Sequence, residues 1–83
     1  MSPKFLSQDG YVFKIFSLEE DRMHIHVVKA ENTAKFWLEP NIELAKNAGF
    51  NSKELSTIQE IIENNADDFK SRYKAHIGRR VND

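Results

Sequence analysis

The chain of 83 residues has no cysteine, only two prolines and three glycines, and no long apolar run. Without cysteine it has neither disulfides nor thiolate metal ligands, which fits a reducing compartment. No stretch approaches the roughly 20 apolar residues that span a bilayer. The segment Met1–Phe5 is too short and too polar for a secretory signal. We therefore expect a cytoplasmic protein that does not associate with membranes.

An excess of charge of either sign is also missing, because 12 Lys and Arg balance 13 Asp and Glu to a net charge of -1. That balance gives no general attraction to nucleic acid. The charges are nevertheless unevenly placed, with an acidic cluster at Glu19–Asp21 and several basic but no acidic residues between Asp68 and Asp83. The length predicts a single α+β domain over residues 1–77, followed by a short basic C-terminal tail over residues 78–83.

Three segments have the alternation or composition of β-strands. Asp9-Gly10 predicts a tight turn, and the aromatic and branched run Tyr11–Phe16 after it predicts the first strand. Met23–Val28 and Lys35–Glu39 alternate apolar and polar residues and predict the second and third strands. Together they indicate an antiparallel meander, with Lys4–Ser7 as a candidate fourth strand.

Two helices are predicted after the strands. Pro40 suits the first turn of a helix and Gly49 suits a helix end, so residues 41–48 are expected to form a short helix. Asn51 begins the second helix, because Glu54 stands at the position that completes a capping box.

The second helix is expected to be long. Apolar residues recur at three- and four-residue spacing along one face: Leu55, Ile58, Ile61, Ile62, Ala66, Phe69 and Tyr73. Asn65 interrupts this stripe, with its amide expected to reach water or backbone. The predicted fold is α+β, a three- or four-stranded antiparallel meander covered on one face by a long C-terminal helix, with a short helix before it.

The pairing of the second and third strands follows from their apolar residues, because a slip of one residue would turn one apolar side to solvent. A register with His26 opposite Trp37 and His24 opposite Glu39 satisfies this condition. Shifting it by two residues changes the partners but keeps the faces. If the helix covers the apolar face, the other face, here called the outer sheet face, collects six side chains: Lys14, His24, His26, Lys35, Trp37 and Glu39.

The two histidines suggest acid-base chemistry on this face. They stand roughly 7 Å apart along one strand, and histidine changes its charge near neutral pH. Cleavage of a phosphodiester needs a base, an acid and a cation. His24, His26 and either Lys35 or Arg22 would supply these groups.

Other interpretations of the same face stay open. A polar outer face is ordinary for an antiparallel sheet covered on one side. Trp37 is less ordinary there, and a large aromatic on a polar surface is typical of a partner or ligand surface. A catalytic zinc would need a third protein ligand beside the two histidines, and only Glu39 is an obvious candidate. We expect neither a metal nor a cofactor.

The chain also carries an ordered series of short motifs: Gly10-Tyr11, EEDRMHIHV at 19–27, AKFWLEP at 34–40, Gly49-Phe50, Glu54-Leu55 and Ile61–Asn64. In this order they resemble a small bacterial family of unknown function, over roughly residues 3–75. The branch with this sequence pattern resembles the DhiT-type toxins of type II toxin-antitoxin systems. The resemblance implies a toxin that inhibits bacterial growth, with RNA or a translation component as the candidate target and a cognate antitoxin as the neutralising partner.

The resemblance points to the motif residues Asp21, His24, His26, Lys35, Trp37 and Glu39, and the strand pattern and the phosphodiester chemistry add Lys14 and Arg22. The candidate catalytic residues are Asp21, His24, His26 and Lys35, and the candidate binding residues are Arg22, Trp37, Glu39 and Lys14. Whether the protein is an enzyme stays open, with RNA-directed chemistry at His24 and His26 as one possibility. The alternative is a non-catalytic protein-binding or regulatory module that uses the Trp37 face. DNA binding by this chain alone is not expected, because no recognition-helix motif is visible.

Overall fold

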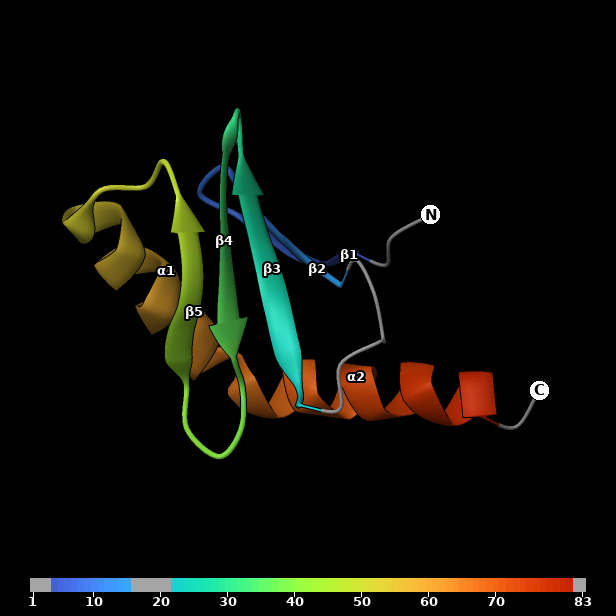
Figure 1. The fold of residues 1–83 in the computed structure, drawn as a ribbon. Coiled ribbons are helices and arrows are strands. Elements are labelled where there is room, and N and C mark those ends of the chain that lie inside the picture. The colour runs from blue at the N-terminus through green and yellow to red at the C-terminus, as the bar shows by residue number, and fades with distance from the viewer. Residues whose placement is uncertain (1–3, 16–21, 82–83) are drawn as a thin grey trace.

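A computed structural model describes residues 4–15 and 22–81, with side chains through residue 75. The described chain is an α+β fold of five strands and two helices (Figure 1). The elements are β1 (Lys4–Gln8), β2 (Tyr11–Lys14), β3 (His24–Lys29), β4 (Asn32–Trp37), β5 (Glu43–Ala48), α1 (Ser52–Asn64) and α2 (Ala66–Val81). The strands form one antiparallel sheet in sequence order. The sheet thus has one strand more than the largest number expected.

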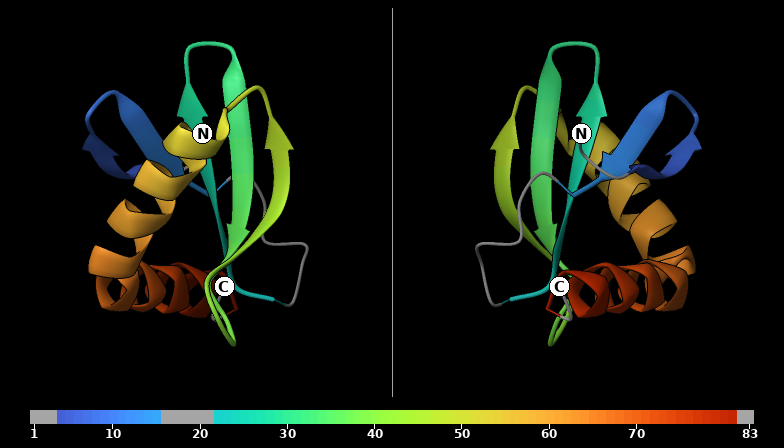
Figure 2. Two further views of the ribbon diagram at one scale, coloured as in Figure 1. Left: turned by 90° about the vertical axis from the view of Figure 1, so that its left-hand side faces the viewer. Right: turned by 90° about the vertical axis from the view of Figure 1, so that its right-hand side faces the viewer.

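The helices lie on one side and at one end of the sheet. Both views in Figure 2 show α1 slanting across one face, while α2 crosses the end where β3 begins. The outer sheet face stays uncovered by helices, as expected. No helix in the described part of the chain is both long enough and apolar enough to cross a membrane.

Two-residue loops close the first and third hairpins. Asp9 and Gly10 have φ values of 54° and 86°, the positive values that a tight hairpin turn requires at both central positions. The predicted turn at these residues is confirmed. The loop between β3 and β4 consists of Ala30 and Glu31, because Lys29 pairs with Asn32. The shorter loop makes the register differ by two residues from the predicted one, so that His24 is opposite Trp37. The faces are unchanged because the shift is even.

The predicted short helix at residues 41–48 is wrong, since most of this segment forms the edge strand β5. Every side chain of β5 is exposed, so a helix here would bury little apolar surface. Extended pairing instead satisfies the backbone groups along the otherwise open edge of β4. The register shifts between Lys35 and Phe36, whose partners are Lys46 and Leu44. Pro40 lies in the connection before β5 rather than in a first helical turn.

The predicted long C-terminal helix is two helices that meet at Asn65. The Asn65 amide nitrogen Nδ2 donates to the Ile61 carbonyl at 2.8 Å, and its backbone N–H donates to the Ile62 carbonyl at 3.1 Å. A side chain bonded to its own backbone in this way competes with continued helix. The expected contact of the Asn65 amide with backbone is confirmed, and its consequence is a change of direction that carries α2 across the end of the sheet.

The start of α1 agrees with the sequence. Asn51 Oδ1 accepts from the Glu54 backbone at 2.8 Å, and Glu54 Oε1 accepts from the Asn51 backbone at 3.0 Å, completing the predicted capping box. At the other end of the helical pair, α2 runs through residues 78–81, which belong to the segment expected as a tail.

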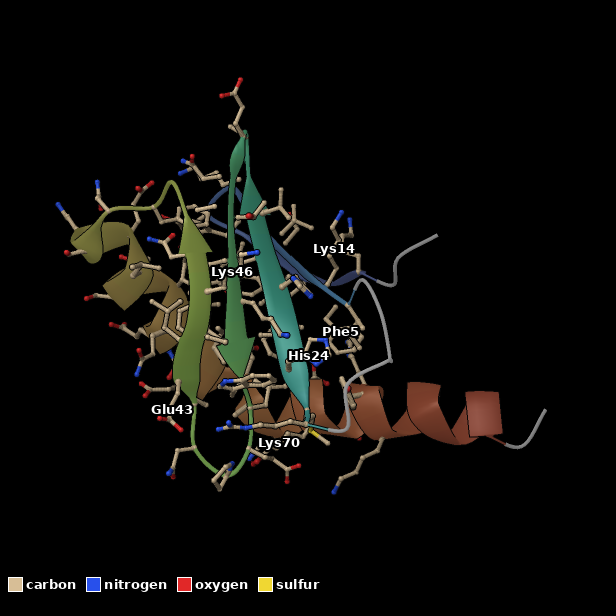
Figure 3. All side chains as sticks on the ribbon, viewed as in Figure 1. Phe5, Lys14, His24, Glu43, Lys46 and Lys70 are labelled. Carbon is tan, nitrogen blue, oxygen red and sulfur yellow. The ribbon has the colours of Figure 1, made fainter. Side chains whose placement is uncertain are left out.

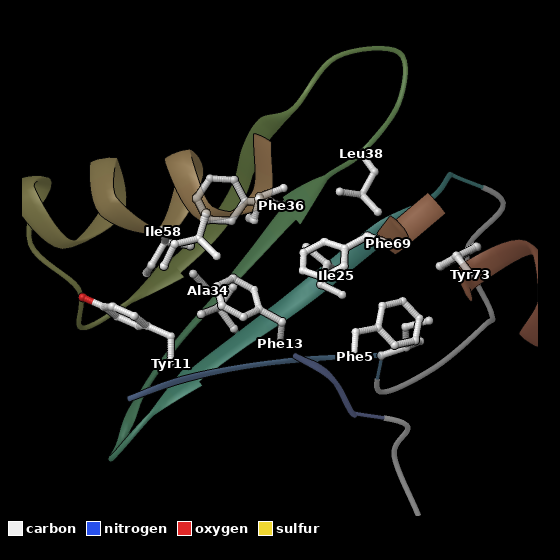
Figure 4. Close-up of a cluster of buried hydrophobic side chains, with 14 of the residues drawn as sticks. Phe5, Tyr11, Phe13, Ile25, Ala34, Phe36, Leu38, Ile58, Phe69 and Tyr73 are labelled. Atoms are coloured by element: carbon white, nitrogen blue, oxygen red, sulfur yellow. The ribbon is translucent and has the colours of Figure 1, made fainter. Parts of the chain in front are cut away.

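The core lies between the sheet and the two helices (Figure 4). It contains the apolar side of the strands and the apolar stripe of both helices. Phe69 of α2 links two strands, because its ring centroid lies 5.9 Å from that of Phe5 and 5.7 Å from that of Phe13. Arg72 adds a polar tie, donating from Nη1 to the Phe5 carbonyl at 3.0 Å. Helix α2 is therefore held against the sheet by β1 and β2.

Candidate functional site

The register aligns basic side chains in one line across the outer sheet face. Lys4 pairs with Lys14, Lys14 with His26, His26 with Lys35, and Lys35 with Lys46. Directly paired residues of neighbouring strands point to the same face. The alignment brings together predicted site residues from β2, β3 and β4. We call these five residues the basic row.

A shallow cavity lies on the basic row. It has a volume of about 210 Å³ and is lined by His26, Thr33, Ala34, Lys35 and Lys46. His26 is half-buried, so its imidazole packs partly against the protein and is partly accessible to solvent. An imidazole beside two ammonium groups in a cavity suits an anionic ligand, because the cations compensate the ligand's charge and histidine exchanges protons near neutral pH.

His24 occupies a different environment although it shares the face of His26. It is only 2% exposed and contacts aromatic rings edge-on, at centroid distances of 5.4 Å to His26, 6.2 Å to Trp37 and 5.8 Å to Tyr73. Its Nδ1 lies 3.0 Å from the Arg22 carbonyl oxygen. Because a carbonyl only accepts, Nδ1 must carry the proton of this hydrogen bond. These contacts suit a residue that positions its neighbours, whereas acid-base work on a bound ligand requires access.

Trp37 is surrounded by cations. The Arg22 Cζ and the Lys35 Nζ each lie 4.5 Å from the centroid of its ring. Arg22 also donates from Nε to the Glu39 carbonyl at 2.6 Å and pairs with the Glu43 carboxylate at 3.2 Å. Cation–π contacts of this kind hold the basic groups in place. Trp37 therefore contacts both Lys35 of the basic row and Arg22 at the end of the outer sheet face. We call the group of residues at this end the closed end: Arg22, His24, Trp37, Glu43 and Tyr73. Figure 3 shows His24 near the end of β3 that α2 crosses, with Lys14 and Lys46 farther along the sheet.

Two of the predicted site residues that the structure describes, Arg22 and Glu39, fall outside the strands. Glu39 was expected on the third strand, but β4 ends at Trp37, and Glu39 lies exposed in the connection to β5. Its neighbour Pro40 has no N–H to extend the pairing, and the backbone carbonyl of Glu39 accepts from Arg22 instead. Asp21, the acidic candidate for catalysis, lies outside the described residues.

The sequence prediction missed Lys46 and Lys4 as members of the site. Lys46 was assigned to a helix, and Lys4 to a candidate strand without a role on the face. The signal that would have found Lys46 is the free edge of the third predicted strand, because an exposed edge tends to be paired or covered.

The charges of the two layers are segregated. The five strands contain five lysines, two histidines and a single carboxylate, that of Glu43. Helix α1 contains three glutamates, and two of them line a surface hollow with Ser56 and Gln59. The net charge of the whole chain therefore conceals a basic sheet and an acidic helix. Across residues 4–15 and 22–75, no group of three or more His, Asp or Glu side chains is placed to hold a metal.

Comparison with known proteins identifies a family. The family model described as Domain of unknown function (DUF4160) matches residues 10–74, a range that includes β2 to β5 and four of the five residues of the basic row. No curated protein and no solved structure gives a significant match. Since the matched range covers well over half of the chain, the protein belongs to this family of domains of unknown function.

Proposed function

We propose that this protein is the toxin of a type II toxin-antitoxin module that inhibits bacterial growth by acting on RNA or on the translation machinery. An antitoxin neutralises it by binding directly to the outer sheet face. The proposal combines the motif resemblance with one structural observation, the cavity that His26 lines beside Lys35 and Lys46 of the next two strands.

The chemistry of the cavity supports an RNA substrate or an RNA-containing target. A phosphodiester carries a negative charge that Lys35 and Lys46 would compensate at the cavity wall. His26 is the accessible imidazole of the pair, so it would move a proton at the reacting oxygen. His24, which is buried against the His26 ring, would orient the His26 imidazole. The working group is thus His26 with its lysines, rather than two equivalent histidines.

The test is growth of a bacterium that expresses the full chain from an inducible promoter and lacks a partner gene. Induction is expected to arrest growth, and co-expression of the small open reading frame adjacent to the native gene is expected to restore it. His26→Ala should abolish the arrest while the purified variant keeps its far-ultraviolet circular dichroism, because His26 is only half-buried. Incorporation of labelled amino acids and RNA integrity, followed after induction, would identify the inhibited process.

A matched control is Lys53→Ala, which removes an exposed lysine from α1, distant from the sheet face. This variant should stay toxic. Unimpaired growth at high levels of the folded wild-type protein would refute the toxin proposal. It would favour instead the non-catalytic module, in which Trp37 and its neighbours bind a partner protein.

A further inference from the structure

The basic row extends beyond the cavity to both edges of the sheet. It has one member on each of the five strands, and neighbouring strands lie about 4.8 Å apart, so it spans about 19 Å. The half-buried residues Lys14, His26 and Lys35 occupy its middle, while Lys4 and Lys46 are exposed at its ends. The row is therefore a continuous line of basic side chains that crosses the strands.

This line is unusual for a surface that only contacts water. Lys4 directly faces Lys14, and Lys35 directly faces Lys46, although like charges opposite each other destabilise a sheet. Ordinary surfaces intersperse both signs of charge. The next line of paired residues carries no charge: Ser7, Val12, Val28, Thr33 and Ala48. On the other side of the row, Glu43 is the carboxylate of the five strands, and it pairs with Arg22.

We propose that the basic row binds the sugar-phosphate backbone of single-stranded RNA, which crosses the strands and brings one phosphodiester to His26. The inference deepens the proposed function, on which the choice of RNA rests. It adds Lys4 and Lys46 as phosphate contacts and gives the bound strand a direction across the sheet. Lysine suits this role because its ammonium is a compact charge with three donors.

The composition and size of the row favour this ligand over two others. Protein interfaces are depleted in lysine at their centres and depend on apolar anchors, whereas the centre of this row is lysine and histidine. Double-stranded RNA is recognised across two successive minor grooves, over roughly 16 base pairs, which is far longer than about 19 Å. A single strand of a few nucleotides matches the extent of the row.

The test uses fluorescence anisotropy with the purified full chain and a labelled oligouridine of about 12 nucleotides. If the four lysines each neutralise one phosphate, log K should fall with log salt with a slope of about -2.8, which is about a 50-fold loss between roughly 50 and 200 mM salt. Lys46→Gln and Lys14→Gln should each reduce the size of the slope by about 0.7. Lys53→Gln, on α1, is the matched control and should leave the slope unchanged.

The outcomes separate this inference from the toxin proposal. Salt-dependent binding that weakens in both row variants supports it, even if the protein does not arrest growth. If the protein arrests growth but binds no oligouridine, or if both row variants bind oligouridine as well as the wild type does, the RNA-binding inference is overturned while the toxin proposal stays intact. Equal competition by an oligoglutamate of the same length would also overturn it, because the row would then recognise an acidic protein segment. Tighter binding of a double-stranded RNA would contradict the single-stranded assignment.

Discussion

His24 and His26 lie two residues apart on the same face of β3, and their surroundings have opposite character. His24 is 2% exposed and is enclosed by the rings of Trp37 and Tyr73, with a hydrogen bond to a backbone carbonyl. His26 lines a cavity of about 210 Å³ beside Lys35 and Lys46. One histidine belongs to the closed end and the other to the basic row.

The difference arises from where α2 crosses the sheet. Tyr73 of α2 reaches the end of the strands and covers His24, whereas the middle of the outer sheet face has no helix over it (Figures 1 and 2). The buried His24 therefore contributes mainly to stability. The basic row lies on the part of the outer sheet face that no helix covers, where a ligand can reach it (Figures 1 and 2).

The largest contrast is expected between alanine substitutions of the two histidines. His24→Ala should reduce the free energy of unfolding by about 2–3 kcal/mol, because it empties a packed site and removes the donor to the Arg22 carbonyl. His26→Ala should cost less than about 1 kcal/mol, since its side chain is half-exposed. Urea denaturation followed by circular dichroism measures both values. Equal losses would show that the two environments do not differ as described.

A smaller effect is expected within the closed end itself. Arg22→Ala should cost about 1–1.5 kcal/mol, because it loses the hydrogen bond to the Glu39 carbonyl and the contact with Trp37. Glu43→Gln should cost less than about 0.5 kcal/mol, because the ion pair is exposed to solvent: the Arg22 side chain is 40% exposed and that of Glu43 is 57% exposed. Thermal melts of the two variants give the comparison. A larger loss for Glu43→Gln would make the ion pair, rather than the Trp37 contact, the main link between β4 and β5 here.

The smallest expected effect has the opposite sign. Lys46→Gln removes one of two lysines that face each other across β4 and β5, so it should stabilise the protein by about 0.2–1 kcal/mol. The same variant is expected to bind RNA more weakly. Thermal melts at low salt would show the gain, which added salt should reduce. A loss of stability in Lys46→Gln would mean that Lys46 stabilises the sheet. The repulsion between Lys35 and Lys46 would then be too weak to support the argument that the row is built for an anionic ligand.

Several elements of the fold follow from local pattern. The turn at Asp9-Gly10, the strands β2 to β4 and the capping box at Asn51 were predicted because each depends on residues close in the sequence. Within β2, β3 and β4 the assignment of side chains to faces was also correct, since it depends only on the alternation of a strand.

The errors lie where distant parts of the chain decide the structure. Residues 43–48 have good helix formers, but pairing with β4 overrides that propensity. The stripe from Leu55 to Tyr73 resumes after Asn65, so it does not reveal that the chain changes direction there to cover both a face and an end of the sheet. Of the candidate site, His26, Lys35 and Lys14 were predicted to share a face, while the enclosure of His24 and the part played by Lys46 were not.

The sequence by itself determined which side chains of β2, β3 and β4 lie on the outer sheet face, because alternation along a strand needs no knowledge of the rest of the chain. The tertiary structure alone decided how they are used. The two-residue hairpin set the register that places Lys35 beside His26, and the pairing of β5 added Lys46. The path of α2 after Asn65 then buried His24 and left His26 accessible, because packing of one helix across the end of a sheet covers one residue of the pair and not the other.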